Sequence, residues 1–127
     1  MRQITVLLTD DNELIRTTLR SWFTAANFRV IEAVDGMNAL ELAIEHAGSI
    51  DVVVTDVRMP RKDGLELRRR LHQMYPEIPV IVISSYADEI LQAYPECIVF
   101  SKPVNPNRLV SKIRKLVDAE GKQSATT

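Results

Sequence analysis

The stretch VVVTDVRMPRKDGLEL, residues 52–67, has the clearest local pattern in the chain. It overlaps a short segment, Asp51 to Thr55, that is β-branched and apolar almost throughout. Continuous apolar runs of this kind are typical of parallel strands that helices cover on both faces. The carboxylate of Asp56 follows directly, and a helical apolar pattern begins at Leu67. The stretch therefore predicts a buried strand, an acidic strand end and a loop that leads into a helix.

Four further strand-like segments repeat this pattern along the chain: Ile4 to Leu8, Arg29 to Ala33, Val80 to Ser84 and Ile98 to Phe100. Helical apolar patterns lie between them, and those before and after the second strand contain Ile15, Leu19, Trp22 and Phe23, and Leu40, Ala43, Ile44 and Ala47. Alternating strands and helices favour an α/β fold with right-handed crossovers. We expect a doubly wound, five-stranded parallel sheet that binds its ligands at the carboxyl ends of the strands.

The last third of the chain is less regular. Residues 88–93 offer one or two helical turns before Pro95 stops them, so the fourth helix should be short or distorted. Asn105 can cap a final helix that has Pro106 at its first position. Residues 119–127 are small and polar without periodicity, which predicts a disordered tail. The expected organisation is one folded domain over residues 1–118 and a tail over 119–127.

Length and composition limit the function. The chain has 127 residues, 46% hydrophobic and 26% charged, with a formal net charge of −1. This length fits one domain, and the charge lacks the basic excess that sequence-independent binding to DNA or anionic membranes needs. Cys97 is the only cysteine, which excludes an intramolecular disulfide. The apolar runs fall far below the ~18 residues of a membrane span, so we expect a soluble, cytoplasmic protein.

Polar side chains stand where the predicted strands end. They are Asp10 and Asp11, Asp56, Ser84 and Lys102. Because carboxyl ends of parallel strands share one edge of the sheet, these five should face one crevice. Three converging carboxylates repel one another unless a cation neutralises them, and oxygen ligands suit Mg²⁺. A cation site with a free carboxylate, an ammonium and a hydroxyl is equipped to accept a phosphoryl group.

These motifs resemble the receiver domain of two-component response regulators. The resemblance runs from Ile4 to about Val117 and rests on LLTDDN, VVVTDVRMPRKDGLEL, PVIVISS and SKP, in that order. It implies a flavodoxin-like fold and a phosphoacceptor switch rather than a conventional enzyme. Such a switch receives its phosphoryl group from a sensor histidine kinase or a histidine phosphotransfer protein and signals to a downstream protein partner. The resemblance leaves open whether the chain forms a homodimer.

The resemblance also implies residue roles. Asp56 corresponds to the phosphoacceptor and, with Asp10, Asp11 and the backbone carbonyl of Arg58, to a ligand of Mg²⁺. Lys102 corresponds to the lysine that pairs with the phosphoryl oxygens, and Ser84 to the hydroxyl that moves to bond them. Pro103 corresponds to a proline whose preceding peptide bond is typically cis.

Several positions depart from the family pattern. Val99 stands where an aromatic residue is usual, and Phe100 should point to the opposite face of its strand. Lys102 follows Ser84 by 18 positions, about four fewer than in the family, which fits a short fourth helix. Arg61 stands where glycine is common.

Arg58 and Tyr86 are large residues that lie two positions after Asp56 and Ser84. We hypothesise that their side chains screen Asp56 from the attacking water and slow dephosphorylation. Two alternatives stay open. One is a receiver-like interaction or dimerisation module that signals without phosphate, which Val99 and the short helix favour. The other is a hydrolase with an aspartyl-phosphate intermediate, although 127 residues leave little for a substrate-enclosing cap.

Overall fold

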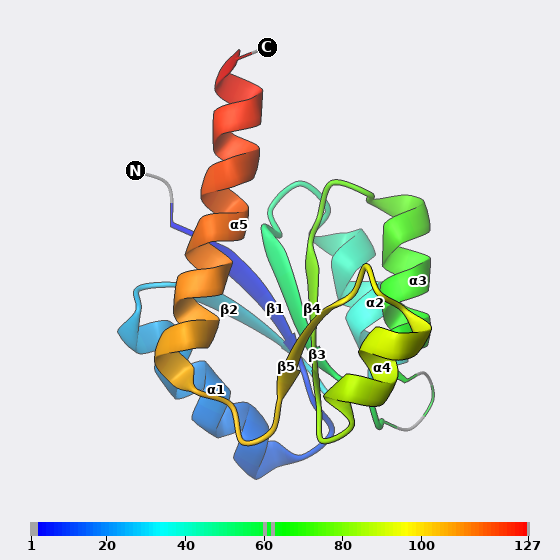
Figure 1. Ribbon diagram of the computed structural model, residues 1–127. Coiled ribbons are helices and arrows are strands. Elements are labelled where there is room, and N and C mark those ends of the chain that lie inside the picture. The colour runs from blue at the N-terminus through cyan, green and yellow to red at the C-terminus, as the bar shows by residue number, and fades with distance from the viewer. Residues whose placement is uncertain (1–2, 60, 62, 127) are drawn as a thin grey trace.

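The computed structural model describes residues 3–59, 61 and 63–126, and their side chains up to residue 118. Strands and helices alternate along the chain (Figure 1). Their bounds are β1 (Thr5–Thr9), α1 (Glu13–Ala25), β2 (Arg29–Ala33), α2 (Gly36–Glu45), β3 (Val52–Asp56), α3 (Gly64–Met74), β4 (Val80–Ser84), α4 (Ala87–Ala93), β5 (Ile98–Ser101) and α5 (Pro106–Thr126). Asp56 and Ser84 are thus the last residues of their strands, and Asp10 and Lys102 follow theirs directly.

The five strands form one sheet in the order β2-β1-β3-β4-β5, and all neighbouring strands are parallel. This is the doubly wound, flavodoxin-like topology that the sequence predicts, and the prediction is confirmed. The chain reverses its direction of travel across the sheet after β2, so β1 and β3 lie side by side. Their carboxyl ends form the switch point at which such sheets bind ligands.

Apolar residues of the central strands divide between the two faces of the sheet. Leu7, Val53 and Val82 pack with buried residues of α2, α3 and α4, whereas Val6, Val54 and Ile81 pack with those of α1 and α5. Figure 1 shows α1 and α5 on one side of the sheet and the other three helices on the opposite side. Because neighbouring residues of a strand point to opposite faces, a continuous apolar run fills both cores.

Side-chain caps fix the starts of four helices. Asn12, Asp35, Asp63 and Asn105 each accept a hydrogen bond from the backbone N–H three residues later. The cap by Asn105 agrees with the sequence. In contrast, α4 begins after Tyr86 without a side-chain cap among the described residues and has 7 residues. The predicted short fourth helix is confirmed.

Two regions differ from what the sequence suggests. Ile44 of α2, expected on the core face, is 52% exposed, because the buried stripe runs through Gly36, Ala39, Leu40 and Ala43 and leaves Ile44 at its edge. Instead of a disordered tail after residue 118, α5 continues to Thr126. Ala, Glu, Lys and Gln, which are frequent in this segment, are strong helix formers that allow a started helix to propagate. The division into a domain and a tail at residue 118 stays a prediction.

Within the described part of the chain, no helix has both the length and the apolar character needed to cross a membrane.

Candidate functional site

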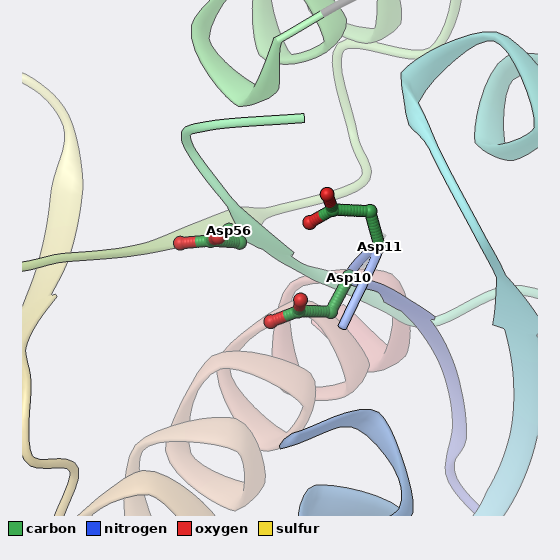
Figure 2. Close-up of side chains that lie close together, drawn as sticks. All are labelled: Asp10, Asp11 and Asp56. Atoms are coloured by element: carbon green, nitrogen blue, oxygen red, sulfur yellow. The ribbon is translucent and has the colours of Figure 1, made fainter. Parts of the chain in front are cut away.

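Three carboxylates meet at the carboxyl edge of the sheet. Asp10 and Asp11 follow β1, Asp56 ends β3, and each offers an oxygen within 4.8 Å of the others. Figure 2 shows the three side chains gathered beside the ends of these strands. The parallel register that pairs Thr9 with Thr55 brings the two acidic strand ends to the same level. Asp10 and Asp56 are 2% and 9% exposed, whereas Asp11 is exposed to solvent.

The environment of Asp10 disfavours its negative charge. Burial is the largest effect, and together with the charges of Asp56 and Asp11 it raises the pKa of Asp10 to about 6. A hydrogen bond from the backbone N–H of Asn12, 2.9 Å long, and the nearby Lys102 ammonium act in the opposite direction without cancelling the effect. A buried carboxyl with a raised pKa next to two further carboxylates is a place where a cation would be stabilising.

Lys102 approaches the cluster from the end of β5. Its Nζ lies 3.0 Å from Oδ1 of Asp56, and its side chain is half-buried. The backbone N–H of Lys102 donates to the carbonyl of Ser84, which fixes the start of the following loop against the end of β4. The peptide bond between Lys102 and Pro103 is cis.

A cavity of about 150 Å³ opens beside Asp56 and Lys102. Its lining includes Ser84, Arg58 and Tyr86. The buried Ser84 Oγ accepts a hydrogen bond of 2.9 Å from the backbone N–H of Tyr86. The Arg58 guanidinium lies over the Tyr86 ring, 4.8 Å from its centroid, so these two side chains join the loops after β3 and β4 across the cavity. A phosphoryl group attached to Asp56 would enter this space.

Val99 and Phe100 point to opposite faces of β5. Val99 packs against the core under α2, α3 and α4, and Phe100 against the core under α1 and α5. Phe100 therefore cannot take the place of the aromatic residue that the family usually has at the position of Val99, because the two side chains lie on different sides of the sheet.

The loop after Asp56 is held close to the strand end. The backbone N–H of Gly64 donates to the carbonyl of Val57 over 2.8 Å. A Cβ atom at Gly64 would lie 2.1 Å from the carbonyl oxygen of Asp56, so only glycine fits this approach. The same loop contains Arg58, whose carbonyl the resemblance assigns to the metal.

Sequence reasoning missed the contacts that two arginines make near this edge of the sheet. Arg61 makes two hydrogen bonds to Asp35, the cap of α2. Arg16 of α1 donates to the backbone carbonyl of Asp10 over 2.8 Å and to Glu32 of β2 over 3.2 Å. The contacts of each arginine join different parts of the fold, and no local sequence pattern predicts them.

The donor set fits Mg²⁺. Three carboxylates face one ammonium, so the cluster keeps an excess of negative charge that a divalent cation would balance. Carboxylate and carbonyl oxygens with room for water are the ligands that Mg²⁺ prefers. The three carboxylates of Asp10, Asp11 and Asp56 are thus the groups in the described residues that could hold this cation, and the Lys102 ammonium lies beside Asp56.

Comparisons with known proteins agree with this geometry. The family model of the response regulator receiver domain matches residues 6–114. The sensor kinase CckA of Brucella abortus (strain 2308) is 32% identical over 120 residues, which cover 91% of this chain and 13% of that protein. The response regulator RR06 of Streptococcus pneumoniae serotype 2 is 35% identical over 117 residues, or 88% of this chain and 52% of the relative. The chain thus spans about half or less of the length of these curated relatives.

A solved structure is similar over nearly the whole chain. It is that of a two-component transcriptional regulator AraC from Clostridium phytofermentans ISDg, with a TM-score of 0.82 and 30% identity. The similarity covers 98% of this chain and 100% of that one.

Proposed function

Because this chain belongs to the response regulator receiver domain family, we propose that Asp56 is the residue that accepts the phosphoryl group, in a Mg²⁺-dependent reaction. The observation that carries this assignment is the position of its carboxylate. One of its oxygens lies within 4.8 Å of a carboxylate oxygen of Asp10 and of Asp11, and its Oδ1 lies 3.0 Å from the Lys102 ammonium. In this place an added phosphoryl group is neutralised from two directions.

The proposed reaction is a phosphoryl transfer from a phosphohistidine. A carboxylate oxygen of Asp56 attacks the phosphorus, an O–P bond forms, the N–P bond of the donor breaks, and its electron pair leaves with the imidazole nitrogen. Such transfers depend mainly on positioning and on neutralising the transferred oxygens. When bound, Mg²⁺ supplies part of this neutralisation.

Residues of this chain supply the remainder. Lys102 already contacts an Asp56 oxygen, so a small movement brings its ammonium to the phosphoryl oxygens. Ser84 Oγ accepts a hydrogen bond from the Tyr86 N–H, which leaves its own hydrogen to donate to the phosphoryl group. These contacts exist only in the phosphorylated state, so they shift the equilibrium between two conformations of the loops that carry them.

Receiver domains interact with histidine kinases or histidine phosphotransfer proteins, and we assign the donor of this chain to the same class. We also propose that the domain promotes its own phosphorylation and dephosphorylation and that it signals through contact with a downstream protein. The relatives are much longer than this chain, so these partner assignments concern the domain itself.

Mass spectrometry of the intact protein tests the assignment. After incubation with acetyl phosphate and Mg²⁺, the protein should gain the mass of one phosphoryl group, and Asp56→Asn should abolish the gain. The matched control is Asp63→Asn, because Asp63 is an exposed helix cap in the same loop region and asparagine caps equally well. A gain that survives Asp56→Asn would place the phosphoryl group elsewhere.

Two observations favour a second candidate, a receiver-like module that signals without phosphate. Val99 replaces the usual aromatic residue, and α4 has only 7 residues. This alternative predicts an unchanged mass in the wild-type protein after the same incubation, and no dependence of its protein contacts on Asp56.

A further inference from the structure

A charged pair joins the loop after Asp56 to the second helix. Arg61 Nε lies 2.7 Å from Asp35 Oδ2, and the Arg61 NH2 nitrogen lies 3.1 Å from Asp35 Oδ1. Two parallel hydrogen bonds between a guanidinium and a carboxylate give a stronger and more directional contact than one ionic contact. The Asp35 side chain is 9% exposed and that of Arg61 is 57% exposed, so the pair lies at the surface with its carboxylate turned inward.

The acceptor of this pair is itself fixed in place. Asp35 caps α2 by accepting a hydrogen bond from the backbone N–H of Asn38 over 2.8 Å. It follows β2, whose last residue, Ala33, accepts a hydrogen bond from the backbone N–H of Asp10 over 3.3 Å. Asp35 is therefore an anchor on the segment that also supports the acidic pair.

The donor stands at an unusual backbone position. Arg61 has a φ of 68°, in the left-handed region that side chains other than glycine, asparagine and aspartate rarely adopt. The loop that contains it is closed at its base by the hydrogen bond from Gly64 to Val57. The contact with Asp35 attaches the loop at a second point. It also offsets the conformational free energy that an arginine costs in the left-handed region.

We propose that Arg61 is a positioning residue, whose pair with Asp35 restrains the chain between β3 and α3, and with it the Arg58 carbonyl, in the place that the metal site needs. This inference rests on the proposed function, because it assigns the Arg58 carbonyl to Mg²⁺. It adds a regulatory consequence: the strength of a contact outside the acidic cluster sets the affinity of the cluster for the cation. A receiver with glycine at this position lacks that contact.

Substitutions of both residues test the pair. Arg61→Ala removes the guanidinium, and Asp35→Asn removes the charge while keeping an oxygen that caps α2. The double variant shows whether the two residues act as one unit. Arg69→Ala is the matched control, since Arg69 is an exposed arginine that also makes a two-pronged pair with a carboxylate, but with Glu66 of its own helix α3 rather than with Asp35.

The first measurement is amide hydrogen exchange by NMR in the absence of metal. The Gly64 amide, which donates to the Val57 carbonyl, should exchange faster in Arg61→Ala, in Asp35→Asn and in the double variant to a similar extent, and at the wild-type rate in Arg69→Ala. Unchanged exchange in Asp35→Asn would overturn the proposal, because the loop would then be held without the pair.

The second measurement is Mg²⁺ binding, followed by calorimetry or by NMR titration. Substituting a residue that contacts a metal ligand typically lowers metal affinity by about 10- to 100-fold. Arg61 acts on the proposed ligand, the Arg58 carbonyl, only through the backbone, so we expect Arg61→Ala to lower the Mg²⁺ affinity by about three- to tenfold. Arg61→Lys, which keeps the charge without the two-pronged geometry, should lie between wild type and Arg61→Ala. Equal Mg²⁺ affinity in wild type and Asp35→Asn would overturn the proposal even if the loop exchanges faster.

Phosphorylation kinetics separate positioning from a loss of folding. The Mg²⁺ concentration for half-maximal phosphorylation should rise in the variants, whereas the rate at saturating Mg²⁺ should stay near that of Arg69→Ala. Urea unfolding at the assay pH checks that each variant is still folded, even where its midpoint falls. A fall in the saturating rate alone would contradict the positioning role. If the wild type binds Mg²⁺ but is never phosphorylated on Asp56, the proposed function fails, while the exchange and binding results still decide the role of Arg61.

Discussion

Lys102 Nζ lies 3.0 Å from Asp56 Oδ1. Asp56 ends β3 and Lys102 follows β5, so the two residues lie on either side of β4 in the sheet. The contact is possible because β4 pairs in parallel with both strands, so that their carboxyl ends reach the same edge. The ammonium is thus in place before any phosphoryl group arrives. Its contribution to the reaction requires little reorganisation, which is the condition for effective electrostatic stabilisation.

Lys102→Gln should slow phosphorylation of Asp56 by acetyl phosphate by about 100-fold at saturating Mg²⁺, because one fixed charge that stabilises the transferred oxygens is lost. Intact mass measured over time gives the rate. Lys115→Gln, on the exposed surface of α5, is the control and should leave the rate unchanged. Equal rates in the two variants would show that Lys102 has only a structural role.

Asp10→Asn should stabilise the metal-free protein at pH 7.5. The pKa of Asp10 rises on folding from 3.8 to about 6, so the folded state binds the proton more tightly than the unfolded state. The associated stability is fully present below pH 3.8 and is lost as the pH rises through 6. The penalty at neutral pH is at most about 3 kcal/mol.

Urea unfolding in EDTA at several pH values measures this effect. The gain from Asp10→Asn should shrink between pH 7 and pH 4, and it should reverse when Mg²⁺ is added at neutral pH, because the variant loses a ligand. A gain that is independent of pH would argue against a charge effect.

Gly64→Ala should both destabilise the protein and impair phosphorylation. The new Cβ would lie 2.1 Å from the Asp56 carbonyl oxygen, so the backbone of the phosphoacceptor or of the loop must shift. Overpacking of this kind costs about 2 to 3 kcal/mol. Urea unfolding and the rate of mass gain should both report the change.

Gly48→Ala is the matched control for this substitution. Gly48 has a φ of 93°, and a Cβ there meets open space among the described residues. It should cost about 1 to 2 kcal/mol through backbone strain alone and leave the phosphorylation rate unchanged. If both variants slow phosphorylation equally, the effect comes from lower stability rather than from a displaced Asp56.

Arg61→Ala should raise the pKa of Asp35. In the folded protein the Arg61 guanidinium holds the pKa of this carboxyl below its usual range, mainly through the hydrogen bonds between them. A depressed pKa contributes stability that is present above the unfolded-state pKa and is lost as the pH falls through the folded-state value. Wild type and variant should therefore differ in unfolding free energy at pH 7 and converge at low pH.

NMR titration of the Asp35 carboxyl checks the pKa directly. Arg69→Ala serves again as the control and should leave that titration where it is in the wild type. An Asp35 pKa that is unaffected by Arg61→Ala would mean that the α2 N-terminus, rather than the guanidinium, stabilises the charge.

The fold and the centre of the candidate site follow from local patterns, whereas the supports of the site do not. Apolar runs such as Asp51 to Thr55 predict buried parallel strands, and the rule for parallel sheets then places Asp10, Asp56 and Lys102 at one edge. The pair of Arg61 and Asp35 escapes this reasoning. It joins residues 26 positions apart and depends on the left-handed backbone of Arg61, which the sequence does not encode in any short pattern.

Removing the side chains of Arg58 and Tyr86 together should speed loss of the phosphoryl group from Asp56. The two side chains line the cavity beside Asp56 and contact each other, with the guanidinium 4.8 Å from the ring centroid. We take this cavity as the route by which water reaches the aspartyl phosphate, and the two side chains obstruct that route. We expect about a three- to tenfold faster decay in the double alanine variant, since the change removes an obstacle and leaves Asp10, Asp11 and Lys102 in place. Decay is followed by intact mass after removal of the donor, with Leu91→Ala, an exposed apolar position of α4 outside the cavity lining, as the control. Each single variant should show part of the effect, because either side chain alone still covers part of the opening. Decay as slow in the double variant as in Leu91→Ala would mean that water reaches Asp56 by another route.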